Sequence, residues 1–284
     1  MKLPFIFARR FVAGETFHDS VPKITRLNDA GIAVTLDLLG ENVSSRTVAS
    51  GTADDYIHLI KQIEHHTMNA SISVKLTMMG LDIDTEFCTE TLFRLLDATR
   101  ENNQFVRIDM EGSNYTSRTI EIFKKAHQEY GADHVGIVLQ AYLHRTREDV
   151  KELSGIGADI RLCKGAYKEP PMLALQQMPD IREAYKEYAK VLLHGTARTR
   201  IATHDDTLVE WVKQYMMEQD INKSNVEFQM LYGLREETMV RLTADGYQTR
   251  VYVPYGTMWF PYYRRRLMER KENIFFIAKT LFKK

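Results

Sequence analysis

Eight short runs of β-forming residues recur along the 284-residue chain, and each ends in a polar or glycine-containing break. The runs are residues 32–40, 72–80, 105–112, 135–142, 160–167, 200–205, 226–233 and 250–256. Between several of them, apolar residues recur every three or four positions, which is typical of helices. These helical segments are residues 53–64, 89–99, 181–193 and 208–217. The runs begin about 30 residues apart, the length of one βα unit, which predicts parallel strands joined by helical crossovers.

Eight βα units predict a (β/α)8 barrel. The open, doubly wound alternative uses fewer strands, and its dinucleotide-binding form carries G-x-G-x-x-G after the first strand. Here the first run ends in LLGENVSS, which lacks that motif. We therefore predict a single domain over residues 1–284, with a short N-terminal arm before the barrel.

The net charge and the number of cysteines indicate which binding partners and which cellular compartment suit this chain. Lys plus Arg and Asp plus Glu both number 38, so the formal net charge is zero, and this gives no support to a nucleic-acid partner. No apolar run reaches the roughly 18 residues of a membrane span. The chain has two cysteines, Cys88 and Cys163, which favours a reducing compartment and predicts a cytoplasmic protein.

Polar side chains lie in or just after nearly every β-run. They are Lys75, Arg107, Asp109, Glu111, Gln140, Arg161, Lys164, Thr203, His204, Asp205, Glu227, Gln229, Arg250 and Tyr252. Barrel enzymes build their active sites at the carboxyl ends of the strands, so these residues suggest one polar pocket. The alternative is that the charges pair with one another inside the barrel, because unpaired buried charges are costly.

The last helix carries a second candidate site. Pro261 suits a first helical turn, and Tyr262, Arg265, Arg266 and Glu269 follow at the spacing of one helical face. Two arginines on one face suit a carboxylate or a phosphate. The alternative is an exposed basic helix end.

Other chemistries find weaker support. A Schiff-base lyase needs a lysine of depressed pKa in an apolar pocket, and Lys75 and Lys164 keep this alternative open. No metal site is predicted, since His204 has no second histidine near a strand end. Cys163 is interpreted as a buried, inert thiol. A barrel that binds a ligand without turnover is the third hypothesis.

An ordered set of motifs on all eight runs, from about residue 8 to the end, resembles the proline dehydrogenase family, in its short, monofunctional bacterial type. The motifs are ARRFVAGE from Ala8, VTLDLLGE from Val34, VKL from Val74, RIDME from Arg107, VLQAY from Val138, RLCKGAY from Arg161, ATHD from Ala202, EFQMLYG from Glu227, VYVPYG from Val251 and YYRRRLME from Tyr262. The resemblance implies a distorted barrel that holds FAD, with the C-terminal helix over the active site.

The resemblance also implies an activity, the oxidation of L-proline to Δ1-pyrroline-5-carboxylate. A hydride would pass from proline C5 to FAD N5, and the electrons would go on to a quinone. This is the first step of proline catabolism to glutamate, so a separate pyrroline-5-carboxylate (aldehyde) dehydrogenase is an expected partner. Use of a quinone implies at most peripheral membrane contact, for which the C-terminal Phe275, Phe276 and Phe282 are candidates.

Residue roles follow from the same resemblance. The expected catalytic residues are Asp109 and Arg161. The expected substrate-binding residues are Lys75, Leu162, Tyr252, Tyr262, Arg265, Arg266 and Glu269, of which the two arginines grip the proline carboxylate and Glu269 orients an arginine. The expected FAD-binding residues are Met110, Gln140, Arg161, Lys164, Gly165, Ala166, Thr203 and His204.

Overall fold

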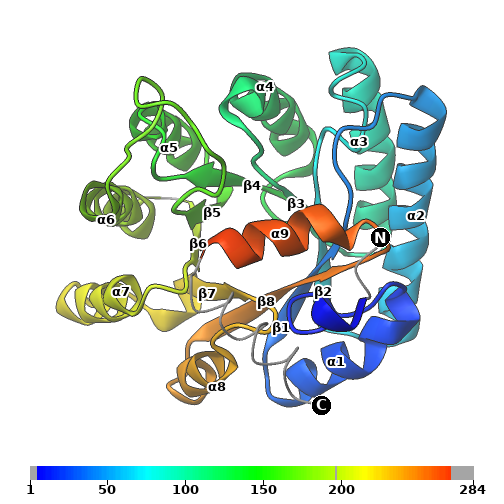
Figure 1. The fold of residues 1–284 in the computed structure, drawn as a ribbon. Helices are drawn as coiled ribbons and strands as arrows, with labels where there is room; N and C mark the ends of the chain where they lie inside the picture. The colour runs from blue at the N-terminus through cyan, green and yellow to red at the C-terminus, as the bar shows by residue number, and fades with distance from the viewer. Residues whose placement is uncertain (1–4, 196, 270–284) are drawn as a thin grey trace.

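Eight parallel strands form a closed barrel in the order in which they occur along the chain (Figure 1). The computed structural model describes residues 5–195 and 197–269, with the side chains of 267–269 outside the description. The strands are β1 (Ala33–Leu38), β2 (Ala70–Val74), β3 (Val106–Ile108), β4 (Val135–Gln140), β5 (Asp159–Cys163), β6 (Arg198–Ala202), β7 (Val226–Leu231) and β8 (Gln248–Tyr255). β8 pairs with β1 from Ala33–Arg250 to Leu38–Tyr255 and closes the barrel. The predicted (β/α)8 fold is confirmed.

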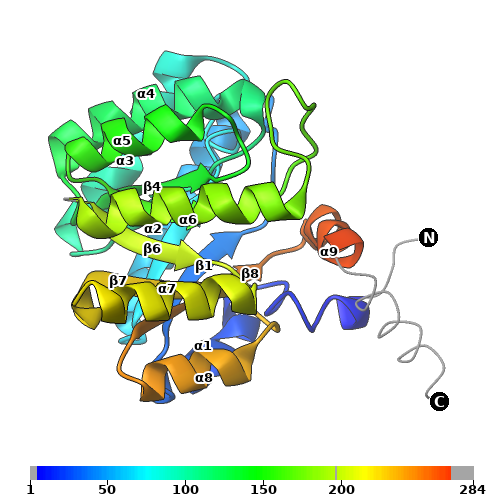
Figure 2. The same ribbon diagram turned by 90° about the vertical axis from the view of Figure 1, so that its left-hand side faces the viewer.

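Helices cover the outside of the barrel and one of its ends. They are α1 (Phe17–Asp29), α2 (Arg46–His65), α3 (Thr85–Glu101), α4 (Ser113–Tyr130), α5 (Thr146–Gly155), α6 (Met178–His194), α7 (Asp206–Glu218), α8 (Glu236–Ala244) and α9 (Trp259–Glu269). Each helix from α2 to α8 follows a strand and lies in the outer ring (Figure 1). The helix after β8 does not join the ring, because α9 lies across the carboxyl ends of the strands (Figure 2). The expected position of the C-terminal helix is thus confirmed.

The ring place that α9 leaves open is taken by α1, which precedes β1 and packs against β1 and β8. The sequence predicts only a short arm for this segment. A capping box begins the helix: the Asp19 amide donates to the Thr16 hydroxyl at 3.2 Å, and the Thr16 amide donates to the Asp19 carboxylate at 3.0 Å. Two orphan amides are satisfied in this way, and Ile24 and Leu27 are buried.

The strands turn apolar side chains outward and polar side chains inward. Val34, Ile72, Ile160 and Phe228 belong to the large apolar core, and each is 1% exposed or less. Strand side chains alternate between faces, so their neighbours in sequence point into the barrel. This interior is divided into two tiers of polar groups, one at each end of the barrel.

The tier at the amino-terminal end consists of paired charges. Asp159 accepts hydrogen bonds from Arg107 and Arg200, and Glu227 accepts one from Arg250 at 2.9 Å. Gly136 makes room for this tier, because a Cβ there would overlap the Arg107 guanidinium. The interpretation that the charges pair inside the barrel therefore holds for this end.

Asp159 should make the stability of the fold depend on acid pH. Burial acts to raise its pKa, but Arg107 and Arg200 outweigh burial, and the pKa lies below the ordinary value. A carboxyl whose folded pKa is depressed stabilises the fold above about pH 4 and loses that contribution as the pH falls through the folded pKa. We expect Asp159→Asn to lower the free energy of unfolding by about 3–5 kcal/mol at pH 7. Between pH 7 and pH 3, the free energy of unfolding should fall less in this variant than in the wild type. Urea unfolding at pH 7 and pH 3 measures both; an equal acid loss in the two proteins would contradict the prediction.

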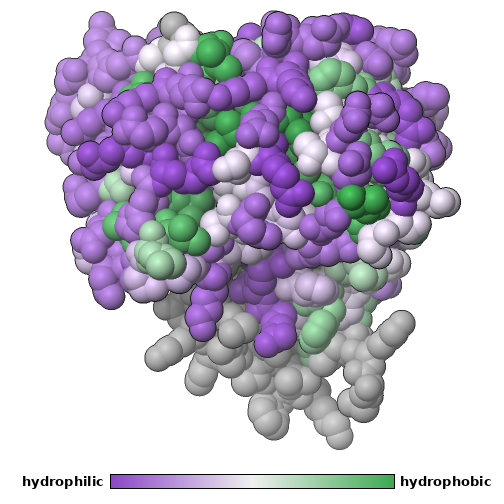
Figure 3. Space-filling model, turned by 90° about the horizontal axis from the view of Figure 1, so that it is seen from above, coloured by the Kyte–Doolittle hydropathy of each residue, from purple (hydrophilic) through white to green (hydrophobic). Residues whose placement is uncertain are grey.

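The outer surface is largely hydrophilic on the side seen in Figure 3, where hydrophobic areas are small and separated. Within the described residues, no helix combines the length and apolar character needed to cross a membrane. Phe275, Phe276 and Phe282, proposed for membrane contact, lie outside the described residues.

Candidate active site

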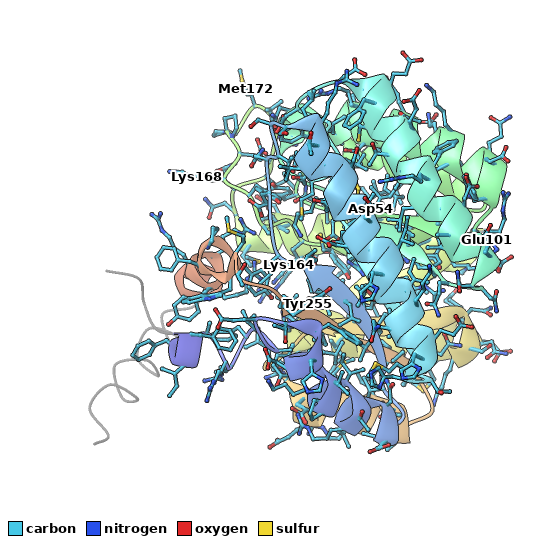
Figure 4. All side chains as sticks on the ribbon, turned by 90° about the vertical axis from the view of Figure 1, so that its right-hand side faces the viewer. Asp54, Glu101, Lys164, Lys168, Met172 and Tyr255 are labelled. Carbon is cyan, nitrogen blue, oxygen red and sulfur yellow. The ribbon has the colours of Figure 1, made fainter. Side chains whose placement is uncertain are left out.

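Helix α9 and the loop between β5 and α6 lie at the carboxyl ends of the strands (Figure 2). An ion pair and a hydrogen bond among Lys75, Asp109 and Tyr252 bring polar side chains together at this end. Figure 4 shows Lys164 and Lys168 on the same side of the molecule as α9, whereas Glu101, at the end of α3, lies at the opposite end of the barrel. The second tier of interior polar groups therefore opens toward α9.

Lys75, directly after β2, is held between two carboxylates. Its Nζ donates to both oxygens of Asp37, at 2.9 and 3.1 Å, and lies 3.6 Å from Asp109. The Asp37 side chain is fully buried and that of Lys75 is 8% exposed. Burial alone would lower the pKa of Lys75, but Asp37 and Asp109 outweigh it and raise the pKa above the ordinary lysine value. Lys75 is therefore a fixed cation.

Asp109, directly after β3, is the centre of the cluster. It accepts hydrogen bonds from Ser73 at 2.6 Å, Tyr252 at 2.7 Å and Arg161 at 3.0 Å. Burial acts to raise its pKa, yet Lys75 and Arg161 together with these hydrogen bonds hold it below the ordinary value. Asp109 is thus an anion that ties β2, β3, β5 and β8 together.

These protonation states bear on the alternative chemistries. A Schiff-base lysine must be neutral to attack a carbonyl, and the raised pKa of Lys75 is the opposite of what that requires. Burial raises the pKa of Cys163 to about 11, so its thiol stays protonated at neutral pH. Among the described residues, no group of three His, Cys, Asp or Glu side chains is arranged to hold a metal ion.

Helix α9 brings two arginines over this pocket. Arg265 donates to both carboxylate oxygens of Glu41, at 2.5 and 3.1 Å. Arg266 is 8% exposed and lies 5.3 Å from the ring centre of Tyr262, which is also buried. The side chain of Glu269, expected to orient an arginine, lies outside the description. Glu41 therefore holds Arg265 in the structure as it stands.

Tyr167, in the loop after β5, connects α9 with the pocket. Its ring centre lies 6.0 Å from the Arg265 guanidinium carbon. Burial raises its pKa, while Lys75 and Arg265 act in the other direction. The contact with Arg265 places this loop beside α9.

The residues expected to bind the cofactor lie at neighbouring strand ends. The Gln140 amide donates to the Glu111 carbonyl at 2.9 Å, Lys164 donates to Asp205 at 3.1 Å, and His204 Nε2 accepts from the Leu231 amide at 2.9 Å. Met110 and Thr203 are buried, Gly165 is half-buried, and Ala166 is exposed. The structure thus places this set on the β3–β6 side of the barrel end.

Gly165 occupies a conformation that suits glycine. Its φ of +118° lies in the region that side chains rarely adopt, and a Cβ there would overlap the Tyr142 ring. The chain turns at this point, directly after the interior residues of β5. A glycine in the K-G-A-Y motif is therefore required by the backbone itself.

The role expected for Leu162, as a wall of the substrate pocket, stays a prediction. Arg161 and Leu162 are neighbours on β5, and strand alternation sends them to opposite faces. Arg161 points inward to Asp109, whereas Leu162 is fully buried in the core between strands and helices. Leu231, at the end of β7, follows Glu227 and Gln229 on the inner face and lies opposite Tyr252 in the strand register.

Three contact residues were missed from the sequence: Asp37, Glu41 and Tyr167. Each lies inside a motif quoted above, yet none was given a role. The alternation that grouped Arg107 with Asp109 also places Asp37 on the inner face of β1, and this signal was available. The sequence gives no comparable signal for the contact between Glu41 and Arg265, because the two residues lie 224 positions apart.

A family model described as proline dehydrogenase matches residues 20–279. The chain belongs to the proline dehydrogenase family. Proline dehydrogenase 2 of Bacillus subtilis (strain 168) is 40% identical over 279 residues, which cover 98% of this chain and 91% of that protein. The proline dehydrogenase of Deinococcus radiodurans is 36% identical, with 97% and 90% covered. This proline dehydrogenase therefore resembles monofunctional bacterial enzymes along nearly their whole length.

Solved structures agree in fold. Proline utilization A (PutA) from Bdellovibrio bacteriovorus, inactivated by N-propargylglycine, superposes with a TM-score of 0.85 at 26% identity. The match covers 93% of this chain and 32% of that one, so this proline dehydrogenase spans about a third of that protein's length. The bifunctional protein PutA of Escherichia coli (strain K12) is likewise 26% identical, with 24% of its length covered.

Proposed function

We propose that this proline dehydrogenase uses FAD to oxidise L-proline to Δ1-pyrroline-5-carboxylate, and that its electrons pass to a quinone. The observation that carries the proposal is the cluster of Lys75, Asp109, Arg161 and Tyr252 under Arg265 and Arg266. The cations of this cluster suit a small carboxylate, and the Tyr252 ring offers a flat apolar surface about the size of the proline ring. Asp109 and Arg161 are proposed as the catalytic residues.

Arg265 and Arg266 are proposed to bind the proline carboxylate. The guanidinium group matches a carboxylate in a two-point, charge-assisted contact. Arg266 is already buried, and Arg265 is held by Glu41 in a carboxylate contact of the same kind. Substrate binding then requires Arg265 to exchange Glu41 for the substrate. Tyr252 and Tyr262 supply the flat sides for the pyrrolidine ring.

The same pocket favours the neutral form of the proline amine. Lys75, Arg161 and Arg266 are cations, and two carboxylates, Asp37 and Asp109, offset the first two. A nearby positive charge disfavours a protonated amine. A neutral nitrogen has the lone pair that forms the product C=N bond as the C5 hydride departs. Tight positioning by the arginines keeps C5 fixed for this transfer.

The residues at the ends of β3 to β6 fit a flavin. When bound, FAD would supply the two-electron acceptor, with N5 taking the hydride. Arg161 would place a positive charge against the ring system, while Gln140, Thr203, His204 and Lys164 are polar groups within the same arc of strand ends. Gly165 and Ala166 bring backbone with little or no side chain to this arc, and Met110 adds a buried apolar contact.

Two further partners follow from this chemistry. The electrons need an acceptor, proposed as a membrane quinone. We propose a cytoplasmic location with at most peripheral contact to the membrane. The product carries an imine in equilibrium with an aldehyde, so a separate pyrroline-5-carboxylate dehydrogenase is proposed to consume it.

A visible spectrum of the purified protein tests the proposal. We expect a yellow protein whose flavin absorbance is lost when L-proline is added without oxygen, and restored by a soluble quinone. D-proline is the matched control, since it has the same groups in the mirror arrangement, and should bleach the flavin far more slowly. A protein that stays colourless and inactive after FAD is supplied would refute the flavin assignment.

A further inference from the structure

A cavity of about 180 Å³ lies in the amino-terminal half of the barrel, on the far side of Arg161 from Asp109. Five arginines and two carboxylates are among its lining residues. No step of proline oxidation uses this space.

The charges around the cavity do not balance within the described part of the chain. Two of the five arginines find carboxylates outside it: Arg161 pairs with Asp109, and Arg198 pairs with Asp133. The remaining arginines are Arg107, Arg200 and Arg250, and the two lining carboxylates are Asp159 and Glu227. One positive charge is therefore left over.

This excess charge lies in a poorly hydrated place. Arg107 and Arg200 share one carboxylate, that of Asp159, whose side chain is 1% exposed. Arg107 also donates to the Ile137 and Asp159 carbonyls, while its Nε is buried without a hydrogen-bond partner. Burial lowers the pKa of Arg107 to about 10. Three guanidinium groups that share two carboxylates lack one counter-charge, which is costly in a buried place. A negatively charged occupant would therefore stabilise this arrangement.

Access and chemistry both suit a small oxyanion. The side chains of Arg200 and Arg250 are 17% and 20% exposed, which gives a route from solvent at this end of the barrel. Arginine presents planar N–H groups that match the oxygens of phosphate and carboxylate. Ser71 and Thr35 add hydroxyl groups to the lining.

We propose that this cavity is a binding site for a small oxyanion, either inorganic phosphate or a small carboxylate. The site is separate from the proline pocket. A chain of side-chain hydrogen bonds joins the two, from Arg161 through Gln229 to Glu227, each at 2.5 Å. The proposal does not depend on the cofactor assignment.

The test is the melting temperature of the FAD-saturated protein as phosphate or acetate is titrated against chloride of equal ionic strength. Saturation with FAD would fill the phosphate contacts of the proposed cofactor site beforehand, and a parallel titration without FAD keeps the result independent of that assignment. We expect the melting temperature to rise and then saturate with at least one of the two anions. A rise with phosphate alone identifies an inorganic oxyanion, and a rise with acetate identifies a carboxylate. Two flat titrations would overturn the proposal.

Two arginine variants test whether the rise in melting temperature comes from anion binding in this cavity. Arg200→Gln removes one positive charge while Arg107 stays paired with Asp159, and should weaken anion affinity at least tenfold. Arg147→Gln, at an exposed arginine paired with Glu187, is the control and should keep the wild-type response.

Ser71→Asp tests the same site in the opposite direction if the arginine variant does not fold. Its carboxylate would lie beside Arg250, which donates to the Ser71 hydroxyl at 3.1 Å. We expect a higher melting temperature without added anion and loss of the titration. An unchanged anion response in both variants would overturn the proposal.

Discussion

Replacing Arg265 or Arg266 by methionine is expected to raise the KM for L-proline roughly 10- to 100-fold, because a charge-assisted hydrogen bond contributes about 1.5–3 kcal/mol. Methionine keeps much of the apolar length of arginine and removes the guanidinium group. The flavin should stay bound, since the residues proposed to hold it lie on β3 to β6 rather than on α9. Steady-state kinetics and the flavin content of each variant measure the two effects.

A control variant and an uncharged substrate analogue distinguish loss of carboxylate binding from a general disturbance of α9. Arg264→Met changes an exposed arginine of the same helix and should leave KM unchanged. L-Prolinamide lacks the carboxylate charge, so its inhibition constant should change little in the Arg265 and Arg266 variants. An unchanged KM in both variants would remove the carboxylate assignment, and an equal loss of L-proline and L-prolinamide would reassign the arginines to packing.

Asp109→Asn is expected to reduce kcat/KM by roughly 100-fold, equivalent to about 2.7 kcal/mol of transition-state stabilisation. The substitution keeps the shape of the side chain but removes the charge that faces Lys75 and Arg161. The asparagine amide cannot accept at both of the positions that now receive Arg161 and Tyr252. Both side chains, and with them the substrate ring, lose their fixed positions.

Loss of stability must be separated from loss of catalysis in this variant. Asp149→Asn is the control, because Asp149 is also buried and paired with an arginine, Arg145, but lies on α5 outside the pocket. We expect both variants to unfold at a lower urea concentration than the wild type. Under conditions where each variant is fully folded, only Asp109→Asn should lose activity. Wild-type kcat/KM in Asp109→Asn would refute the catalytic assignment.

Much of the barrel is decided locally, and the sequence was sufficient for it. Alternating strand residues and helical periodicity are properties of neighbouring residues, so all eight strands could be located, with ends shifted by a few residues. The face shared by Tyr262, Arg265 and Arg266 is equally local, since it depends only on the helical repeat. The inward direction of Asp109 and Arg161 follows from the same period-two rule, which also sends Leu162 to the other face of β5.

Contacts across the closed barrel were decided only by the tertiary structure. Asp37 reaches Lys75 because β1 and β2 are neighbours in a particular register, and Glu41 reaches Arg265 because α9 crosses the barrel end instead of joining the ring. Helix α1, from the other end of the chain, occupies the ring position that α9 leaves open. Strand register and helix placement are set by packing between segments far apart in sequence. The sequence by itself therefore determined which residues face the interior, and the tertiary structure decided which of them pair and which form the pocket.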